Sequence, residues 1–227
     1  MHIGLIGGIG VAATLVYYKR LTAAIAAKGA PVELTIVHAE ASTLIANNLA
    51  DKREDQAQVF ARLIDRLRAA GCDCAAITSL GGHFCYAETA AISSLPLVSG
   101  VTPLDAHFAA QRIDTIGLLG TKVVMETRLY SQLEKTRAVV PEADLATVGQ
   151  NYLDMATSGE CSEEQRAFFF AHGRKMMADQ GADAILLAGT DLGLAFDGFD
   201  PGYPVIDALD VHVDLLARLA AGEAKLE

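Results

Sequence analysis

The segment AAITSLGGHF, residues 75–84, decides the fold because it joins a buried strand to a polar loop. It continues a short apolar run over residues 74–77, which is typical of a strand buried in a parallel sheet. Upstream, residues 61–70 carry apolar side chains at helical spacing, and Gly71 marks the end of that helix. Directly after the strand come hydroxyls, glycines and an imidazole, at Thr78, Ser79, Gly81, Gly82 and His83. Such groups past the carboxyl end of a strand predict a ligand site in an open α/β sheet.

The same order of elements returns in the second half of the chain. Residues 168–181 predict a helix that ends at a glycine, residues 184–187 an apolar strand, and residues 188–192 a polar turn. The opening strand repeats as well, since GLIG at residues 4–7 matches GLLG at residues 117–120. The two matches indicate an internal duplication. We therefore expect two strand-end loops that face one cleft.

Apolar runs and turn residues predict strands that alternate with helices, which is the pattern of an α/β fold with parallel sheets flanked by helices. Strands are expected at residues 2–6, 32–38, 74–77, 95–98, 115–119, 138–143, 184–187 and 205–207. Helices are expected at residues 12–27, 40–48, 52–70, 86–94, 103–110, 125–134, 153–158, 163–179 and 210–221. No low-complexity linker separates the halves. We predict two domains, residues 1–101 with 206–227 and residues 102–205.

Composition and charge limit the class of protein. Apolar residues make up 52% of the 227 residues and charged residues 20%, which indicates a folded globular protein. A net charge of −10 argues against a nucleic-acid partner, which would require a basic surface. No apolar run approaches the roughly 18 to 20 residues of a membrane span, and the first residues lack a secretory pattern. We expect a cytoplasmic protein with no membrane partner.

The four cysteines, Cys72, Cys74, Cys85 and Cys161, lack the CxxC spacing of zinc sites and redox pairs, so no metal site is predicted.

The glycine turn GGIG at residues 7–10 admits three interpretations. It could be a dinucleotide fingerprint, but the G-x-G-x-x-G spacing is missing. It could bind a small anion through backbone N–H groups at a helix N-terminus, which we rank above a nucleotide, or the glycines could serve the turn alone.

Thr121 and Thr190 each follow an apolar strand, where a hydroxyl can bind a carboxylate or cap the next helix, and both roles remain open. His83 and His212 are candidate acid–base groups. A lone histidine is more often a hydrogen-bonded structural residue, so this alternative also stays open. Cys85 follows His83 closely, and we expect it to pack against the core.

Five segments resemble the motifs of one known family, in order. Thr14, Tyr17 and Tyr18 follow the glycine turn as they follow the GGMGP motif of the aspartate/glutamate racemase superfamily, with Val11 in place of the proline. SLGGH at residues 79–83 lines up with the family's first catalytic loop, usually CNTAH. The remaining three are GLLGT at residues 117–121, similar to LLAT; AGTD at residues 188–191, similar to GCTE; and VIDALDVH at residues 205–212, similar to ID-x-x-x-x-H.

The resemblance implies an amino-acid racemase, an isomerase with two pseudosymmetric α/β domains, an active site between them and no cofactor. It also implies a small carboxylate or acidic amino acid as substrate, and a homodimer. Family members usually use two cysteines on opposite faces of the α-carbon, because a thiol can serve as base and as acid near neutral pH. The positions that correspond to substrate-binding residues are Gly8, Gly10, Thr14, Thr78, Gly81, Gly82, Thr121 and Thr190. The catalytic positions are Ser79, His83, Gly189 and Asp191.

The chain departs from the family pattern at both catalytic cysteines, since Ser79 and Gly189 stand in their places. Leu80 and Gly81 replace the asparagine and threonine that help to hold the substrate carboxylate. A serine hydroxyl is a poor base on its own, and glycine has no side chain, so ordinary two-thiol racemisation is predicted to be absent. Three interpretations stay open: altered carbanion chemistry that recruits Ser79, His83, Asp191 or Cys85; a non-catalytic binding or regulatory protein; or an engineered sequence.

Overall fold

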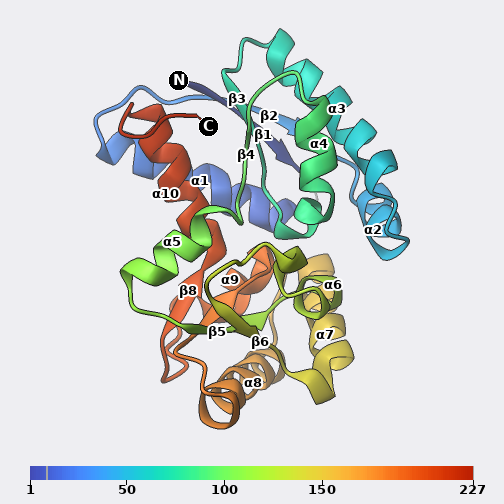
Figure 1. Cartoon of the computed structure of the whole chain (residues 1–227), viewed down its shortest axis with the longest axis vertical. Coiled ribbons are helices and arrows are strands. Elements are labelled where there is room, and N and C mark those ends of the chain that lie inside the picture. Colours follow the sequence, from blue (N-terminus) through green and yellow to red (C-terminus); the bar gives the residue numbers. More distant parts are fainter. Residues whose placement is uncertain (9, 227) are drawn as a thin grey trace. The chain divides into compact units, whose positions relative to one another are not determined.

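The computed structural model describes residues 1–8 and 10–226, which divide into two compact α/β units (Figure 1). Unit 1 comprises Met1–Gly100 with Leu209–Glu227, and unit 2 comprises Val101–Ala208. The sequence-based division placed a boundary between residues 205 and 206. In the structure that position lies inside strand β8 (Val205–Asp207), and β8 pairs with its neighbour in unit 2 along its whole length.

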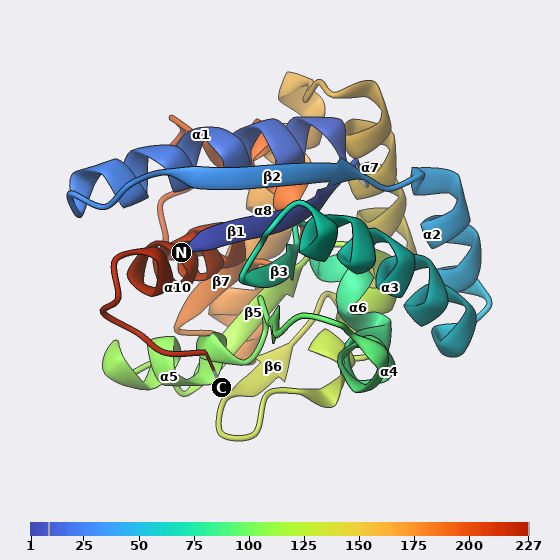
Figure 2. The same cartoon turned by 90° about the horizontal axis from the view of Figure 1, so that it is seen from above.

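Unit 1 is built on a parallel sheet with the strand order β2-β1-β3-β4. Its strands are β1 (His2–Gly7), β2 (Glu33–His38), β3 (Cys74–Ile77) and β4 (Leu97–Val98). Its helices are α1 (Val11–Ala27), α2 (Ala41–Leu49), α3 (Arg53–Ala69), α4 (Tyr86–Ile92) and α10 (Ala208–Ala220), with a 3-10 helix η1 (Leu80–Cys85) after β3. Figure 2 shows α1 running alongside β2 and β1.

Side chains alternate along β1, so its two faces have different partners. Ile3 and Leu5 belong to an apolar core with side chains of α1 and α10, such as Leu21 and Leu216. On the opposite face, Gly4 allows α3 to pack close to the strand, because a Cβ at this position would lie 2.8 Å from Leu67 Cδ1. The buried residues of α3 follow the apolar spacing expected from the sequence, and they include Phe60, Leu63, Ile64 and Leu67.

Unit 2 repeats the arrangement with the strand order β6-β5-β7-β8, again all parallel. The other strands are β5 (Thr115–Leu119), β6 (Arg137–Val139) and β7 (Ala184–Leu187). The helices are α5 (Pro103–Ala110), α6 (Lys122–Glu126), α7 (Leu145–Ser158), α8 (Glu163–Gln180) and α9 (Gly193–Phe196), with 3-10 helices η2 (Leu129–Ser131), η3 (Glu142–Asp144) and η4 (Thr190–Leu192). The two sheets share one strand order, as an internal duplication predicts.

The structure differs most from the sequence prediction at two helices and one strand. The expected helix at residues 125–134 is wrong, because α6 ends at Glu126 and the chain from Arg128 to Ser131 is left-handed, with φ between +47° and +59°. The expected strand at residues 138–143 is shorter, since β6 ends at Val139 before Pro141. The helix expected at residues 153–158 begins earlier, at Leu145. Gly149 made this helix hard to recognise because glycine disfavours a helix interior.

Two helices of the structure end at the glycines that the sequence predicted. Gly71 and Gly181 adopt positive φ angles of +86° and +66°, a conformation that glycine accepts without a steric penalty. At the other end of α8, Ser162 and Gln165 form a reciprocal capping box that satisfies orphan N–H groups. No helix in the described part of the chain is long and apolar enough to cross a membrane.

The left-handed turn after α6 yields a stability prediction. Ser131 has φ +56°, which costs an L-residue about 1–2 kcal/mol relative to the right-handed region. We expect Ser131→Gly to raise the free energy of unfolding by roughly 0.5–1 kcal/mol, because relief of this strain exceeds the entropy cost of glycine. The matched control is Gln132→Gly at φ −93°, which should lower the stability by about the same amount. Urea denaturation that ranks the two variants in the opposite order would contradict this account.

Candidate active-site loops

Each unit carries a polar loop directly after the third strand of its sheet, counted along the chain. In unit 1 the Thr78 N–H donates to the Ile6 carbonyl at 3.1 Å, and in unit 2 the Ala188 N–H donates to the Leu119 carbonyl at 2.7 Å. Ser79 and Gly189 then adopt nearly the same extended conformation, with φ/ψ of −148°/127° and −144°/122°. Each precedes a 3-10 helix. The two loops are therefore structural equivalents within the duplicated units.

In unit 1 the predicted residues gather at the carboxyl ends of the neighbouring strands β1 and β3. The Thr78 hydroxyl donates to the Ile6 carbonyl at 3.0 Å, which ties the loop to β1 and occupies that hydroxyl. Ser79 is half-buried, and its hydroxyl has no hydrogen-bond partner among residues 1–8 and 10–226. Of these two predicted site residues, Ser79 offers the hydroxyl that is available to a ligand.

His83 is fully buried, and both of its ring nitrogens are bonded to backbone. Nδ1 donates to the Ser79 carbonyl at 2.8 Å, and Nε2 accepts from the Gly100 N–H at 2.9 Å. This bonding pattern assigns a neutral imidazole with its proton on Nδ1. Burial lowers the pKa of His83 to about 4, and the Tyr86 ring stacks on it. In this structure the histidine holds the Ser79 backbone, and the predicted acid–base role would require one nitrogen to be released.

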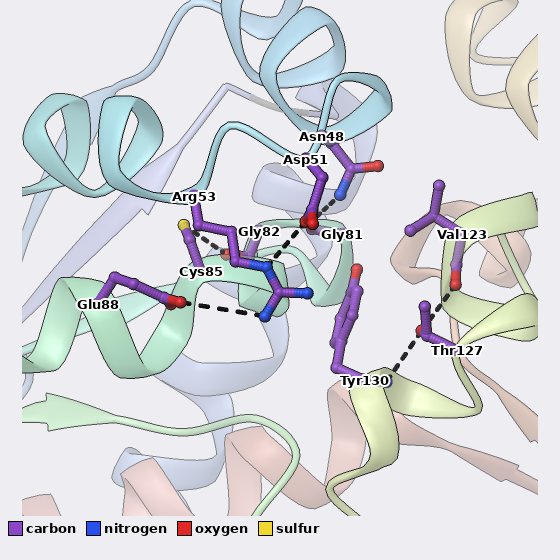
Figure 3. Close-up of polar contacts among 10 residues, drawn as sticks. All are labelled: Asn48, Asp51, Arg53, Gly81, Gly82, Cys85, Glu88, Val123, Thr127 and Tyr130. Atoms are coloured by element: carbon purple, nitrogen blue, oxygen red, sulfur yellow. Dashed lines mark hydrogen bonds and ion pairs between the residues drawn. The ribbon is translucent and has the colours of Figure 1, made fainter.

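The two glycines of the first loop are held through their carbonyls. Asn48 Nδ2 of α2 donates to the Gly81 carbonyl at 3.2 Å, and the Cys85 thiol donates to the Gly82 carbonyl at 3.6 Å (Figure 3). Burial raises the pKa of Cys85 to about 11, so this thiol is a poor base near neutral pH. The expectation that Cys85 packs into the core agrees with its complete burial.

A charged group also lies near this loop. The Arg53 guanidinium binds Asp51 at 2.8 Å and lies 3.9 Å from a Glu88 carboxylate oxygen (Figure 3). Both carboxylates belong to unit 1, so the cation is compensated locally. An anionic ligand that used Arg53 would compete with these two partners.

The glycine turn of unit 1 is stabilised from within. The Gly8 N–H donates to Thr14 Oγ1 at 3.0 Å, and the Thr14 hydroxyl donates to the Gly10 carbonyl at 2.9 Å. Gly8 has φ +96°, and a Cβ there would lie 2.6 Å from the Ala39 carbonyl, so the position requires glycine. The middle residue of the turn, Ile9, lies outside the described residues. Anion binding by this turn remains a prediction, and Thr14 already accepts the Gly8 N–H.

In unit 2 the predicted residues gather at the carboxyl ends of β5 and β7. Thr121 caps α6, since its hydroxyl accepts from the Val124 N–H at 3.2 Å, as one of the two sequence interpretations expected. Thr190 and Asp191 are buried in η4. The ligand-binding roles predicted for Thr121 and Thr190 stay predictions.

Tyr152 of α7 is the residue that sequence reasoning missed. Its ring covers Gly189, because a Cβ at Gly189 would lie 2.3 Å from Tyr152 Cε2 and 3.0 Å from its hydroxyl oxygen. The hydroxyl donates to Asp191 Oδ2 at 3.1 Å. Burial and then the Asp191 charge raise the pKa of Tyr152 well above its ordinary value. The helix expected at residues 153–158 began one residue too late to include this side chain.

Among residues 1–8 and 10–226, no three or more His, Cys, Asp and Glu side chains are grouped so that they could hold a metal ion. The predicted catalytic residues are instead surrounded by backbone amides, hydroxyls and buried rings.

Comparisons with known proteins agree with this architecture. A model of the Asp/Glu/Hydantoin racemase family matches residues 6–216. A candidate Asp/Glu racemase from Yersinia pestis has a similar structure, with 24% identity, a TM-score of 0.83 and coverage of 97% of this chain and 99% of that one. An aspartate racemase homologue from Pyrococcus horikoshii OT3 shares 21% identity, with a TM-score of 0.78 and the same coverage. The aspartate racemase of Picrophilus torridus shares 18% identity, with a TM-score of 0.76 and coverage of 100% and 96%.

The buried histidines of unit 1 predict a pH-dependent stability. Burial lowers the pKa of His83 to about 4 and that of His212 to about 3, from an ordinary value of 6.5. Between these values the unfolded chain binds protons that the folded chain does not, so stability is full above about pH 6.5 and falls as the pH decreases. From about pH 7 to about pH 5 we expect a loss of about 2 kcal/mol for each histidine.

The measurement is urea denaturation at several pH values. His83→Gln should remove about half of this pH-dependent loss, because the substituted side chain does not titrate. An unaltered pH dependence in His83→Gln would show that this imidazole is not the neutral, buried group described above.

Proposed function

Because this chain belongs to the Asp/Glu/Hydantoin racemase family, we propose that it binds a small carboxylate or acidic amino acid and performs carbanion chemistry other than two-thiol racemisation. The loops after β3 and β7 are the ligand-binding parts of this proposal. The chemistry runs without a cofactor, and the protein works as a homodimer, as the family resemblance implies.

The observation that carries the proposal is the pair of equivalent positions Ser79 and Gly189. They share one backbone conformation in two equivalent loops, and neither provides a thiol. Cys72, Cys74 and Cys85 are buried within unit 1, and burial raises the pKa of each thiol. Cys161 precedes α8 and its pKa is raised as well. Since a thiol must ionise near neutrality to remove an α-proton, these cysteines are poor substitutes for the missing pair.

A second candidate function is a binding or regulatory protein without catalysis. It is favoured by the internal bonding of unit 1, where Thr78 and His83 after β3, and Gly8 in the glycine turn after β1, are each bonded to other parts of the unit. Such a loop can hold a ligand while it lacks a base for proton removal. Both functions involve the same class of ligand, but only the first converts that ligand into a product. One experiment that measures binding and turnover can therefore separate them.

The test combines ligand binding with isotope exchange. We expect small mono- and dicarboxylates to raise the melting temperature, since a ligand at 100 times its Kd adds about 2.7 kcal/mol of stability. The corresponding uncharged amides should not. In heavy water, D- and L-aspartate and glutamate should gain no α-deuterium above the enzyme-free rate, because each lost acid–base group is worth roughly 10²–10⁴-fold.

Ser79→Ala should reduce the increase in melting temperature that carboxylates cause. The matched control is Ser94→Ala, at a serine bonded to Asp65, which should leave that increase unchanged. Rapid α-deuterium exchange would contradict the loss of racemase chemistry. The absence of a thermal shift with every carboxylate tested would contradict the proposed ligand class. Stabilisation without turnover of any substrate would favour the binding protein.

A further inference from the structure

Strand β2 forms a free edge of the sheet in unit 1, and it differs in length from the other edge strands. It has six residues, whereas β4 has two and β6 and β8 have three each. Among residues 1–8 and 10–226, β2 pairs with β1 alone. A short edge strand offers few unpaired backbone groups to another chain, so shortness protects the other three edges. The edge of β2 lacks this protection.

The bonding to β1 shows which groups of β2 face outward. Directly after the strand, the Ala39 N–H donates to the Gly7 carbonyl at 2.7 Å. The N–H and C=O of one residue point to the same side of a strand, and that side alternates along the chain, so the odd-numbered residues of β2 bond to β1. Leu34, Ile36 and His38 therefore direct their N–H and C=O groups to the free edge. Another strand can bond there without breaking any bond within unit 1.

Exposed apolar side chains of α1 and β2 gather beside this edge, and we call them the α1–β2 patch. On α1, Val11, Leu15 and Tyr18 follow helical spacing and are 62%, 65% and 51% exposed. At β2, Val32 and Ile36 are 43% and 41% exposed. These five are more than half of the nine large apolar side chains that are exposed among the described residues. Exposed apolar side chains that cluster in this way mark an interaction surface.

Both parts of the patch lie on one face of the sheet and at the same edge. Ile36 is in register with Leu5, which belongs to the core shared with α1, so Ile36 points to the face that α1 covers. Figure 2 shows α1 running alongside β2 and β1. On the opposite flank of α1, Arg20 binds Asp210 of α10 at 2.7 Å. The apolar stripe of α1 therefore points away from α10 and towards the edge of β2.

The distribution of charge favours a second copy of this chain as the partner at the patch. The net charge of −10 opposes the approach of two copies wherever carboxylates would meet. Helix α1 contains no Asp or Glu. The one acidic residue of β2, Glu33, lies on the opposite face of the sheet from Ile36, because side chains alternate along a strand. Two patches can therefore meet without bringing carboxylates together.

Resting on the homodimer of the proposed function, we propose that the edge of β2 and the α1–β2 patch form the dimer interface. A two-fold axis perpendicular to the sheet, at Thr35 or Ile36, pairs β2 with β2 of the second copy in antiparallel direction. The two sheets then become one continuous sheet. Because such an axis keeps the faces of the sheet, it also brings the two α1–β2 patches together on one side of the joined sheet.

The size of the patch is consistent with a dimer of ordinary stability. At roughly 100 Å² for a fully exposed apolar side chain, its five members contribute about 250 Å² per copy. A standard interface buries about 800 Å² per partner, with an apolar centre and a polar rim. The patch supplies the centre, and the strand edge with the polar flanks of α1 and β2 supplies the remainder.

Sedimentation velocity of the full chain over a range of concentrations tests the interface. We expect a wild-type mass of about twice the 23.9 kDa of one chain. Leu15→Glu places a carboxylate of each copy against the other, so the Kd of the dimer should rise by about 100-fold or more. The matched control is Leu49→Glu on α2, which is 71% exposed and outside the patch, and it should leave the Kd unchanged. Melting temperatures of both variants verify that they fold.

The strand pairing has a separate test by disulfide cross-linking. A residue on the two-fold axis faces its own copy at a Cα separation of about 4.5–5.5 Å, which a disulfide can bridge. In a Cys161→Ser background, which removes the cysteine that is not buried, either Thr35→Cys or Ile36→Cys should give a covalent dimer on mild oxidation. Leu49→Cys should not. In addition, Ile36→Pro removes an outward N–H and no bond to β1, and it should weaken the dimer.

The outcomes separate this inference from the function on which it rests. A wild-type monomer at 100 times the concentration of the assay would overturn the interface and the homodimer, and it would leave the proposed ligand class standing. A dimer that Leu15→Glu and Ile36→Pro leave intact would overturn the interface alone. A dimer without a cross-link at residue 35 or 36 would overturn the antiparallel pairing of β2, and so would a cross-link of equal yield at residue 49.

Discussion

Parallel pairing between the first and third strands of each unit is the constraint on which the candidate site depends. Ile6 is in register with Ile77, and Leu119 with Leu187. Strands paired in this way end at the same edge of a sheet, so the loops that follow them are neighbours. One backbone hydrogen bond in each unit then fixes the first loop residue against the end of the adjacent strand. Because the same pairing occurs twice, the loops of the two units have the same backbone conformation. The side chains on the two loops are different.

The two loops have no thiol at the equivalent positions 79 and 189, and they differ in what stands there. In unit 1 the loop keeps a small hydroxyl at Ser79, and its backbone is held by a neutral His83 that bridges to Gly100. In unit 2 the side chain is absent, and the aromatic ring of Tyr152 fills the space. Buried polar groups need hydrogen-bond partners, and His83 in the first loop bonds to backbone groups whereas Asp191 in the second accepts from the Tyr152 hydroxyl. Chemical symmetry is therefore broken although the backbone symmetry is kept.

Much of the fold could be predicted from the sequence, because its strands are short apolar runs and its long helices have a clear apolar face. Gly71 and Gly181 also predicted where two of the helices end. The predictions failed where local preference and tertiary packing disagree. Gly149 lies inside α7 because a Cβ there would be 2.7 Å from the Lys122 amide nitrogen, a contact that no local pattern reveals. The candidate catalytic positions were assigned by resemblance, and their roles stay predictions. Tyr152 could not be identified in this way, because its place depends on a contact between α7 and a loop that is distant in sequence.

The contact between Tyr152 and Gly189 also bears on how such a protein can change over generations. A mutation that introduced a cysteine at position 189 would collide with the ring, so its fitness effect depends on what residue 152 is. Any side chain at position 189 is thus separated from the present sequence by coupled steps, and replacement of the tyrosine must come first. Epistasis of this kind favours retention of glycine at position 189 for as long as residue 152 keeps its aromatic ring.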